Sequence, residues 1–268
     1  MDDETASMKR GLSWVEVKES LNTDGCPVCN TMSRSIDKYF DYLLYEYALD
    51  AAVHKKTLAS FGMCNTHTFL LKEAEEKLKS DGLNISVLYE TLFQKEEKLL
   101  AKVEEKELVE NSNHFTAFRK RRDFTAYKKE ILSDLLVKPA RPVGGGICPG
   151  CQHQKESESF YTHEILRLYK DDEFRNKYEN ERILLCRRHF LFIVNEAKEI
   201  EAVKYFVSKQ REKIRSLHQQ LSSFIEKHDY RLKSGITEKE KISWEKALEY
   251  FGSKKNINRD GYNDLLIQ

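Results

Sequence analysis

I-C-P-G-C-Q-H, from Ile147 to His153, contains a C-P-x-C motif, and C-P-V-C at Cys26–Cys29 repeats it 122 positions earlier. In both copies, 34 residues separate this motif from a C-x-x-H motif, at Cys64–His67 and at Cys186–His189. Residues of the two spacers also match at the same offset: Tyr39 with Tyr161, Leu44 with Leu166, Tyr47 with Tyr169, and Asp50 with Asp172. The pattern indicates a duplicated module.

The repeated motifs use all six cysteines of the chain, three in each copy, together with one histidine per copy. Three thiolates and one imidazole form a recognised structural zinc set, which fills a tetrahedral shell. We therefore predict two zinc ions per chain, with one site in each copy. The first predicted set is Cys26, Cys29, Cys64 and His67; the second is Cys148, Cys151, Cys186 and His189.

Other uses of the cysteines stay open at this point. An iron–sulfur cluster is one alternative, although such clusters usually take four cysteines. Thiol redox chemistry or metal sensing through the C-P-x-C pairs is another. His153 could compete as a ligand in the second copy, but the first copy has no matching histidine, so we prefer His189. Because four protein ligands leave no coordination position for water, we expect structural and not catalytic metal sites.

The rest of the sequence predicts an all-α protein of two similar lobes. The proline- and glycine-rich residues 137–147 read as a linker between an N-terminal module, 1–136, and a C-terminal module, 148–268. Apolar residues at helical spacing and capping signals predict the helices, and no segment alternates with a period of two. The main predicted helices are 36–49, 65–79, 84–107, 114–137, 187–198 and 201–229, with a last helix opened by a capping box at 237–240.

Composition limits the classes of partner. Lys and Arg number 45 against 44 Asp and Glu, so no overall field draws the chain to a polyanion or a membrane. The N-terminus is polar and no window approaches a membrane span, which predicts a cytoplasmic protein without membrane contact. One local exception is the basic run Arg119, Lys120, Arg121 and Arg122, which lies among aromatic residues and could contact nucleic acid. The alternative interpretation is that these basic residues form the solvent-exposed face of a helix and bind no nucleic acid.

The paired C-P-x-C and C-x-x-H motifs, with Trp244, Ala247 and Leu248 as a W-x-x-A-L segment, resemble an uncharacterised family of bacterial and archaeal helical proteins. The resemblance extends from about Leu12 to Phe251 and implies the helical architecture and the same ligands. It implies no activity. Since no catalytic constellation stands outside the predicted ligands, we expect a non-catalytic interaction or adaptor protein that binds another protein.

Overall fold

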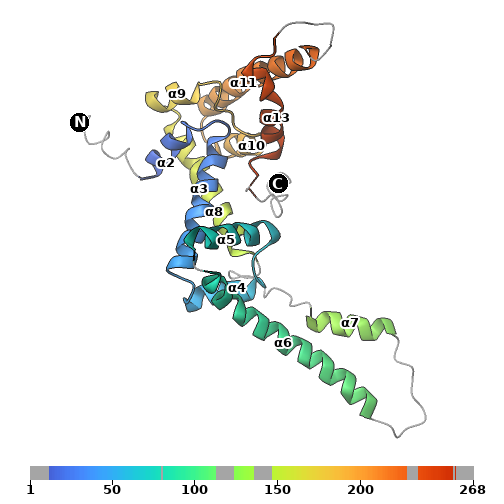
Figure 1. The fold of residues 1–268 in the computed structure, drawn as a ribbon. Coiled ribbons are helices and arrows are strands. Elements are labelled where there is room, and N and C mark those ends of the chain that lie inside the picture. Colours follow the sequence, from blue (N-terminus) through green and yellow to red (C-terminus); the bar gives the residue numbers. More distant parts are fainter. Residues whose placement is uncertain are drawn as a thin grey trace. The chain divides into compact units, whose positions relative to one another are not determined.

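The structure is a computed structural model that describes residues 12–79, 81–112, 124–135, 147–227, 235–255 and 257 (Figure 1). Within these ranges the protein is all-α, as predicted, and the one β interaction is an isolated parallel bridge between Gly25 and Ile183. The helices are α2 (Leu12–Ser20), α3 (Pro27–Tyr45), α4 (Ala51–Ala59), α5 (Asn65–Leu78), α6 (Leu83–Ser112), α7 (Phe124–Leu135), α8 (Pro149–Leu168), α9 (Asp172–Tyr178), α10 (Arg187–Glu196), α11 (Ile200–Lys227), α12 (Glu238–Lys241) and α13 (Ser243–Gly252). None of the described helices is long and apolar enough to cross a membrane.

Local signals in the sequence explain where several helices begin. Asp50 caps α4 and Asp171 caps α9, because their carboxylates accept hydrogen bonds from N–H groups of the first turn. The predicted capping box is confirmed: the Thr237 hydroxyl accepts from the Glu240 N–H, and the Glu240 carboxylate accepts from the Thr237 N–H. α3 is shorter at its end than predicted, since it stops at Tyr45 and not at Leu49.

The chain forms two compact units. Unit 1 comprises Met1–Ile36 and His153–Gln268, and unit 2 comprises Asp37–Gln152. These units differ from the sequence halves 1–136 and 148–268, because α3 and α8 each begin in one unit and end in the other. The expected linker, 137–147, lies outside the described residues except for Ile147, so it stays a prediction.

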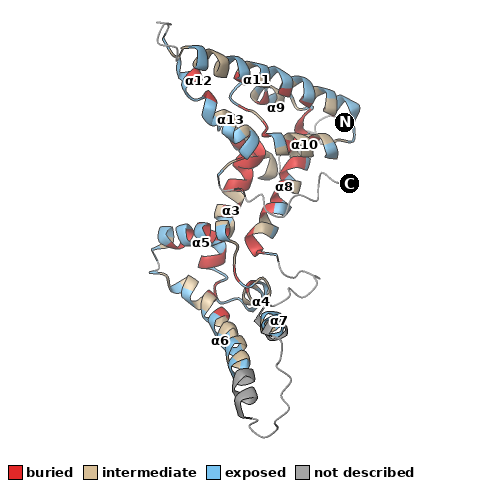
Figure 2. Ribbon diagram, turned by 90° about the vertical axis from the view of Figure 1, so that its right-hand side faces the viewer, coloured by how far each residue is buried: buried red, intermediate tan, exposed pale blue. Residues whose placement is uncertain are grey.

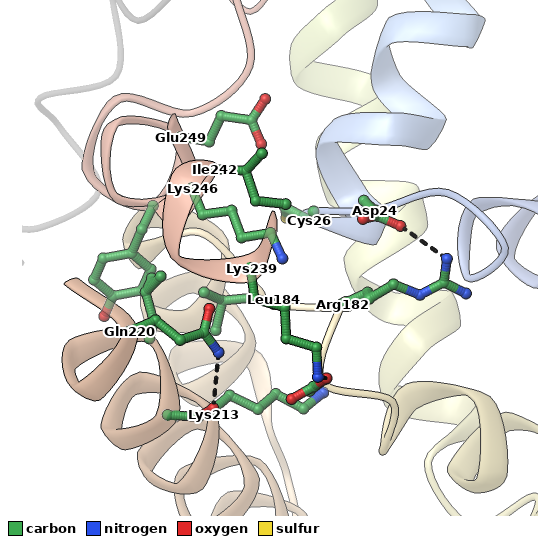
Figure 3. Close-up of a pocket in the computed structure, with 15 residues that line it drawn as sticks. Asp24, Cys26, Arg182, Leu184, Lys213, Gln220, Lys239, Ile242, Lys246 and Glu249 are labelled. Atoms are coloured by element: carbon green, nitrogen blue, oxygen red, sulfur yellow. Dashed lines mark hydrogen bonds and ion pairs between the residues drawn. The ribbon is translucent and has the colours of Figure 1, made fainter. Parts of the chain in front are cut away.

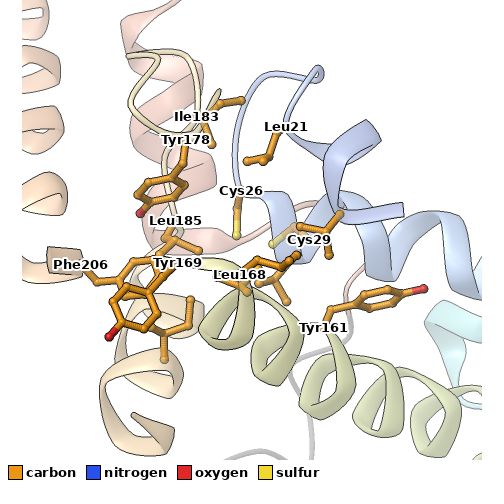
Figure 4. Packing of buried hydrophobic residues seen from close by; sticks show 14 of the residues in the cluster. Leu21, Cys26, Cys29, Tyr161, Leu168, Tyr169, Tyr178, Ile183, Leu185 and Phe206 are labelled. Atoms are coloured by element: carbon orange, nitrogen blue, oxygen red, sulfur yellow. The ribbon is translucent and has the colours of Figure 1, made fainter. Parts of the chain in front are cut away.

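Unit 1 has an aromatic core built by α9, α11 and the end of α8. Tyr178 and Phe206 are fully buried, and their rings meet edge-on with centroids 5.6 Å apart. Phe174 stacks on the other side of Tyr178 at 5.5 Å. Such offset and edge-on ring pairs stabilise a core beyond their buried area. Figure 4 shows that this apolar cluster also surrounds Cys26 and Cys29, and Figure 2 shows α11 turning a largely exposed outer face to solvent.

Unit 2 has a smaller core of aliphatic residues with one phenylalanine. α6 contacts α4, α5 and α7. Most of the buried apolar side chains come from α3, α5 and the first turns of α6: Phe40, Leu43, Leu44, Leu70, Leu71, Ala74, Leu88 and Leu92. Because few side chains are buried, a metal centre would contribute much of the order in this unit.

Candidate metal centres

Each of the four Cys-containing motifs occupies the N-terminus of a helix. Cys64 and Cys186 are the N-cap residues of α5 and α10, and the histidine three positions later lies in the first turn. Cys26 and Cys148 stand immediately before α3 and α8; the Cys26 carbonyl accepts the first helical hydrogen bond, from the Asn30 N–H, at 2.9 Å. All four motifs therefore place two ligand side chains at i and i+3 on one face of a helix end, where the helix dipole favours anionic sulfur.

The structure pairs the motifs across the two copies. One cluster contains Cys26, Cys29, Cys186 and His189; the other contains Cys64, His67, Cys148 and Cys151. All eight predicted residues thus lie in two Cys3His clusters, but the predicted grouping within each copy is wrong. The physical reason is the length of α3 and α8. α3 begins in unit 1 and ends in unit 2, and α8 begins in unit 2 and ends in unit 1, so each C-P-x-C motif and the C-x-x-H motif that follows it belong to different units.

In the unit 1 cluster, the His189 Nδ1 atom faces three sulfur atoms. It lies 3.3 Å from Cys26 Sγ, 3.3 Å from Cys29 Sγ and 3.2 Å from Cys186 Sγ. The sulfurs of Cys29 and Cys186 are 3.8 Å apart. A tetrahedral zinc with ordinary bond lengths separates two sulfurs by about 3.8 Å, and a sulfur and a nitrogen by about 3.6 Å. The donor atoms therefore fit a zinc ion with little rearrangement.

A carboxylate supports the far side of the His189 ring. Glu158 Oε1 lies 2.9 Å from His189 Nε2, and the Glu158 carboxylate accepts two hydrogen bonds from Arg188, at 2.6 and 2.7 Å. Burial raises the pKa of Glu158, but its contacts with His189 and Arg188 outweigh burial and lower it. An ionised Glu158 would hold the imidazole proton on Nε2, which would leave Nδ1 free to bind a metal ion.

The loop before Cys186 is held from two sides. On one side, Gly25 donates from its N–H to the Arg182 carbonyl at 2.9 Å and accepts from the Leu184 N–H at 3.1 Å. On the other, the Gln210 side chain on α11 donates to the Leu185 carbonyl at 2.8 Å, and the Lys213 amine donates to the Ile183 carbonyl at 2.6 Å. Both ligand motifs of this centre are thereby joined to each other and to the core of unit 1.

The unit 2 cluster has the same donors in a similar arrangement. His67 Nδ1 lies 3.2 Å from Cys64 Sγ, 3.5 Å from Cys148 Sγ and 3.4 Å from Cys151 Sγ. Cys64 and Cys151 are 3.7 Å apart. Gly150 makes this approach possible, since a Cβ atom there would lie only 2.6 Å from the His67 ring. These distances also match a tetrahedral Cys3His zinc shell.

The surroundings of the unit 2 cluster differ from those in unit 1. His67 Nε2 is buried, and no hydrogen-bond partner for it occurs among the described residues. The positions that match Glu158 and Arg188 at the offset of 122 are Ile36 and Thr66, neither of which carries a charge. Met63 brings its Sδ to 3.7 Å from Cys148 Sγ. Cys64 and Cys151 are only partly buried.

Within each cluster the thiols and the imidazole shift one another's pKa values. Hydrogen bonds with Cys148 and Cys151 lower the pKa of Cys64, and hydrogen bonds with Cys26 and Cys29 lower that of Cys186. Burial lowers the pKa of His67, but hydrogen bonds with Cys148 and Cys64 outweigh it and raise the value to about 9. In contrast, burial raises the pKa of Cys26, and hydrogen bonds with Cys148 and Cys64 raise that of Cys151. Each cluster therefore combines thiolates with protonated thiols, and a divalent cation that bound there would release the remaining protons.

A pocket of about 140 Å³ lies beside the unit 1 cluster, and Cys26 forms part of its wall (Figure 3). Charged side chains from α11, α12, α13 and the loop before Cys186 line it. Asp24 pairs with Arg182 at 3.5 Å, and Lys239 pairs with Glu181. Lys213, which also lines the pocket, is 6% exposed, and burial lowers its pKa to about 7.

Two other sequence predictions have separate outcomes. His153 is not in a cluster, and its Nε2 lies 2.8 Å from the Ser35 hydroxyl, whereas His189 lies with three cysteines. Ser35 also hydrogen-bonds Ser157, its match in the second copy, at 3.0 Å. The basic run Arg119, Lys120, Arg121 and Arg122 lies outside the described residues, so nucleic-acid binding stays a prediction.

Sequence reasoning missed the residues that support the ligands. Gly25, Glu158, Gln210 and Lys213 belong to no repeated motif. Glu158 follows the C-P-x-C motif of α8, but the cluster that it contacts contains neither cysteine of that motif, so its position in the sequence gave no signal. The one sign of a special role for Gly150 is that the matched position of the first C-P-x-C motif is Val28.

Fold and clusters together define a helical protein with two Cys3His clusters, each built from helix N-termini. The chain belongs to the family described as "Family of unknown function (DUF6062)", which matches residues 8–258. It is similar to an "Uncharacterized 23.9 kDa protein in xynA 3'region" of Caldicellulosiruptor sp. (strain Rt8B.4), with 23% identity over 236 residues, 87% of this chain and 97% of the relative. No solved structure matches the chain.

Proposed function

We propose that each cluster binds one zinc ion as a structural centre, and that the protein acts by binding another protein. The observation that carries the zinc assignment is the spacing of the donor atoms. Nitrogen–sulfur distances of 3.2–3.5 Å and sulfur–sulfur distances of 3.7 and 3.8 Å match a tetrahedral shell in both clusters. Four protein ligands complete that shell, so the ion would hold helices together and would not activate water.

Elemental analysis of protein purified without oxygen or added metal tests the zinc assignment. We expect close to two zinc ions per chain and no visible absorbance. A strong chelator should then lower the helical content and the melting temperature, because binding free energy of a structural zinc is folding free energy. Iron with absorbance near ~400 nm would instead support the iron–sulfur alternative and overturn the assignment.

The support for a protein partner comes from α13, whose apolar stripe is exposed. Trp244 is 49% exposed, Leu248 64% and Phe251 63%, and their spacing of four and three residues places them on one face. Glu245 and Glu249 flank that stripe on one side, and Glu249 also lines the pocket in Figure 3. An exposed aromatic and aliphatic stripe on a short helix is typical of a protein interaction site.

The acidic flank indicates the chemistry of the partner. Two copies of α13 packed antiparallel about a two-fold axis would bring Glu245 and Glu249 of both copies together, and like charges oppose that pairing. A partner helix could cover the apolar stripe with an apolar face of its own, and lysine or arginine beside that face could pair with the two glutamates. We therefore propose a basic amphipathic helix of another protein as the occupant.

Tryptophan fluorescence measures this binding directly. In a Trp14→Phe background, Trp244 is the one remaining tryptophan, and a lysine–leucine amphipathic peptide should shift its emission to shorter wavelength. Leu248→Glu should weaken binding at least tenfold, whereas Ile225→Glu, at a 70% exposed site on α11, should not. Equal binding of a glutamate–leucine peptide, or no effect of Leu248→Glu, would contradict the proposed surface.

A further inference from the structure

The two centres share their donors but differ in how far solvent reaches the sulfurs. In unit 1, Cys29 is 2% exposed and Cys186 is 1% exposed. In unit 2, Cys64 and Cys151 are both partly exposed, and their sulfurs lie 3.7 Å apart. The sulfurs of Cys29 and Cys186 are almost as close, at 3.8 Å. The two pairs therefore differ in solvent exposure and in the side chains around them, and not in the distance between their sulfurs.

We propose that the unit 2 centre is an oxidation site: a peroxide joins Cys64 and Cys151 in a disulfide, and the zinc ion leaves. This inference rests on the proposed zinc binding. One thiolate attacks a peroxide oxygen, the O–O bond breaks, and a sulfenic acid forms with loss of water. The second thiolate then displaces hydroxide from the sulfenic sulfur. Overall, two thiolates, two protons and hydrogen peroxide give one disulfide and two waters.

The two sulfurs of the unit 2 centre must approach each other before a disulfide can form. A disulfide needs a sulfur–sulfur distance of about 2.05 Å, so the pair must close by roughly 1.7 Å. Cys64 precedes α5 and follows the turn Phe61–Gly62, in which both residues have positive φ, 56° and 94°. That turn is held in place, because the Gly62 N–H donates to the Thr57 carbonyl at 2.9 Å and the Ser60 hydroxyl donates to the Gly62 carbonyl at 2.8 Å. The approach of the two sulfurs would therefore come from rotation of the Cys64 and Cys151 side chains. Loss of two of its four ligands would release the zinc ion.

The unit 1 centre has features that oppose the same reaction. Its sulfurs lie in the main apolar cluster, and the Glu158 carboxylate, which pairs with Arg188, lies 2.9 Å from His189 Nε2. Among the described residues, no carboxylate forms such a pair with His67. Cys26 forms part of the wall of the pocket in Figure 3 and, at 8% exposed, is the most exposed cysteine of this centre. Modification of Cys26 is therefore the main rival outcome.

The experiment exposes the protein with two bound zinc ions to hydrogen peroxide and follows released zinc with a chromogenic chelator. We expect one zinc ion per chain to leave at least tenfold faster than the other. Peptide mapping without reduction should show a Cys64–Cys151 disulfide while Cys29 and Cys186 remain thiols. Treatment with a thiol reductant and zinc should restore the centre.

Controls separate this inference from its alternatives. Met63→Leu removes the thioether beside Cys148 and should leave the fast release unchanged, because the reaction belongs to the thiolates. Release of both ions at one rate, or first modification of Cys26, would overturn the oxidation site while leaving the zinc assignment intact. Protein that contains no zinc at the start would instead overturn the proposed function.

Discussion

Cys29 Sγ lies 3.8 Å from Cys186 Sγ, although 157 positions separate the two residues in the sequence. This contact joins the C-P-x-C motif of one copy to the C-x-x-H motif of the other. In unit 2, Cys151 and Cys64 make the reciprocal contact at 3.7 Å. A metal ion bound at either cluster would therefore close a long loop of the chain, and such closure restricts the unfolded chain.

Glu158→Gln should weaken zinc binding in unit 1. The substitution removes the charge that Arg188 and His189 Nε2 face, and loss of such a supporting partner typically costs ~10-fold to ~100-fold in metal affinity. Competition with a chromogenic chelator should show one of the two zinc ions leaving more easily. Glu164→Gln, which alters a more exposed pair with Arg167, is the matched control and should change neither ion. Unchanged affinity in Glu158→Gln would contradict a supporting role.

Gly150→Ala should weaken zinc binding in unit 2. The new methyl group would approach the His67 ring to 2.6 Å, and overpacking of this kind costs about 1–3 kcal/mol. The same chelator competition measures the loss, which we expect at roughly tenfold. Gly252→Ala, where nothing lies within 4 Å of the added atom, is the control. A stable Gly150→Ala protein that binds zinc with wild-type affinity would show that the site does not depend on close contact between residue 150 and the His67 ring.

Lys213→Met should change how stability depends on pH. Burial lowers the pKa of Lys213 to about 7, against about 10.4 in an unfolded chain, so the unfolded state binds more protons between those values. The free energy of unfolding should therefore rise with pH from 7 to 10 through this group, by at most about 1.4 kcal/mol per pH unit. Denaturant unfolding at pH 7, 8 and 9 tests this. The slope should be smaller in Lys213→Met, and equal slopes would contradict the shifted pKa.

Much of the helical structure could be predicted from the sequence because its signals are local. The prediction 65–79 matches α5 (Asn65–Leu78), and Thr237 with Glu240 forms the predicted capping box. Helical periodicity and helix caps depend on residues that are close in the sequence, so the tertiary structure of the rest of the chain affects them little. The ligand types were likewise readable, since all cysteines fell into the repeated motifs.

The pairing of the motifs could not be predicted from spacing. Cys26 and Cys148 begin equivalent helices, and the same eight ligands divide equally well within the copies or across them. The path of α3 and α8 between the units decides the pairing, and no local signal encodes that path. Glu158 was missed for a related reason: Ile36 occupies its matched position, so the repeat gave no sign of a supporting carboxylate.

The zinc content of two triple variants tests the crossed pairing most directly. C26S/C29S/C186S removes three ligands from the unit 1 centre alone, so we predict one zinc ion per chain retained against a chelator. C26S/C29S/C64S removes ligands from both centres, so we predict that neither ion is retained. The reverse result, with one ion retained only in C26S/C29S/C64S, would place each centre within one copy and contradict the account.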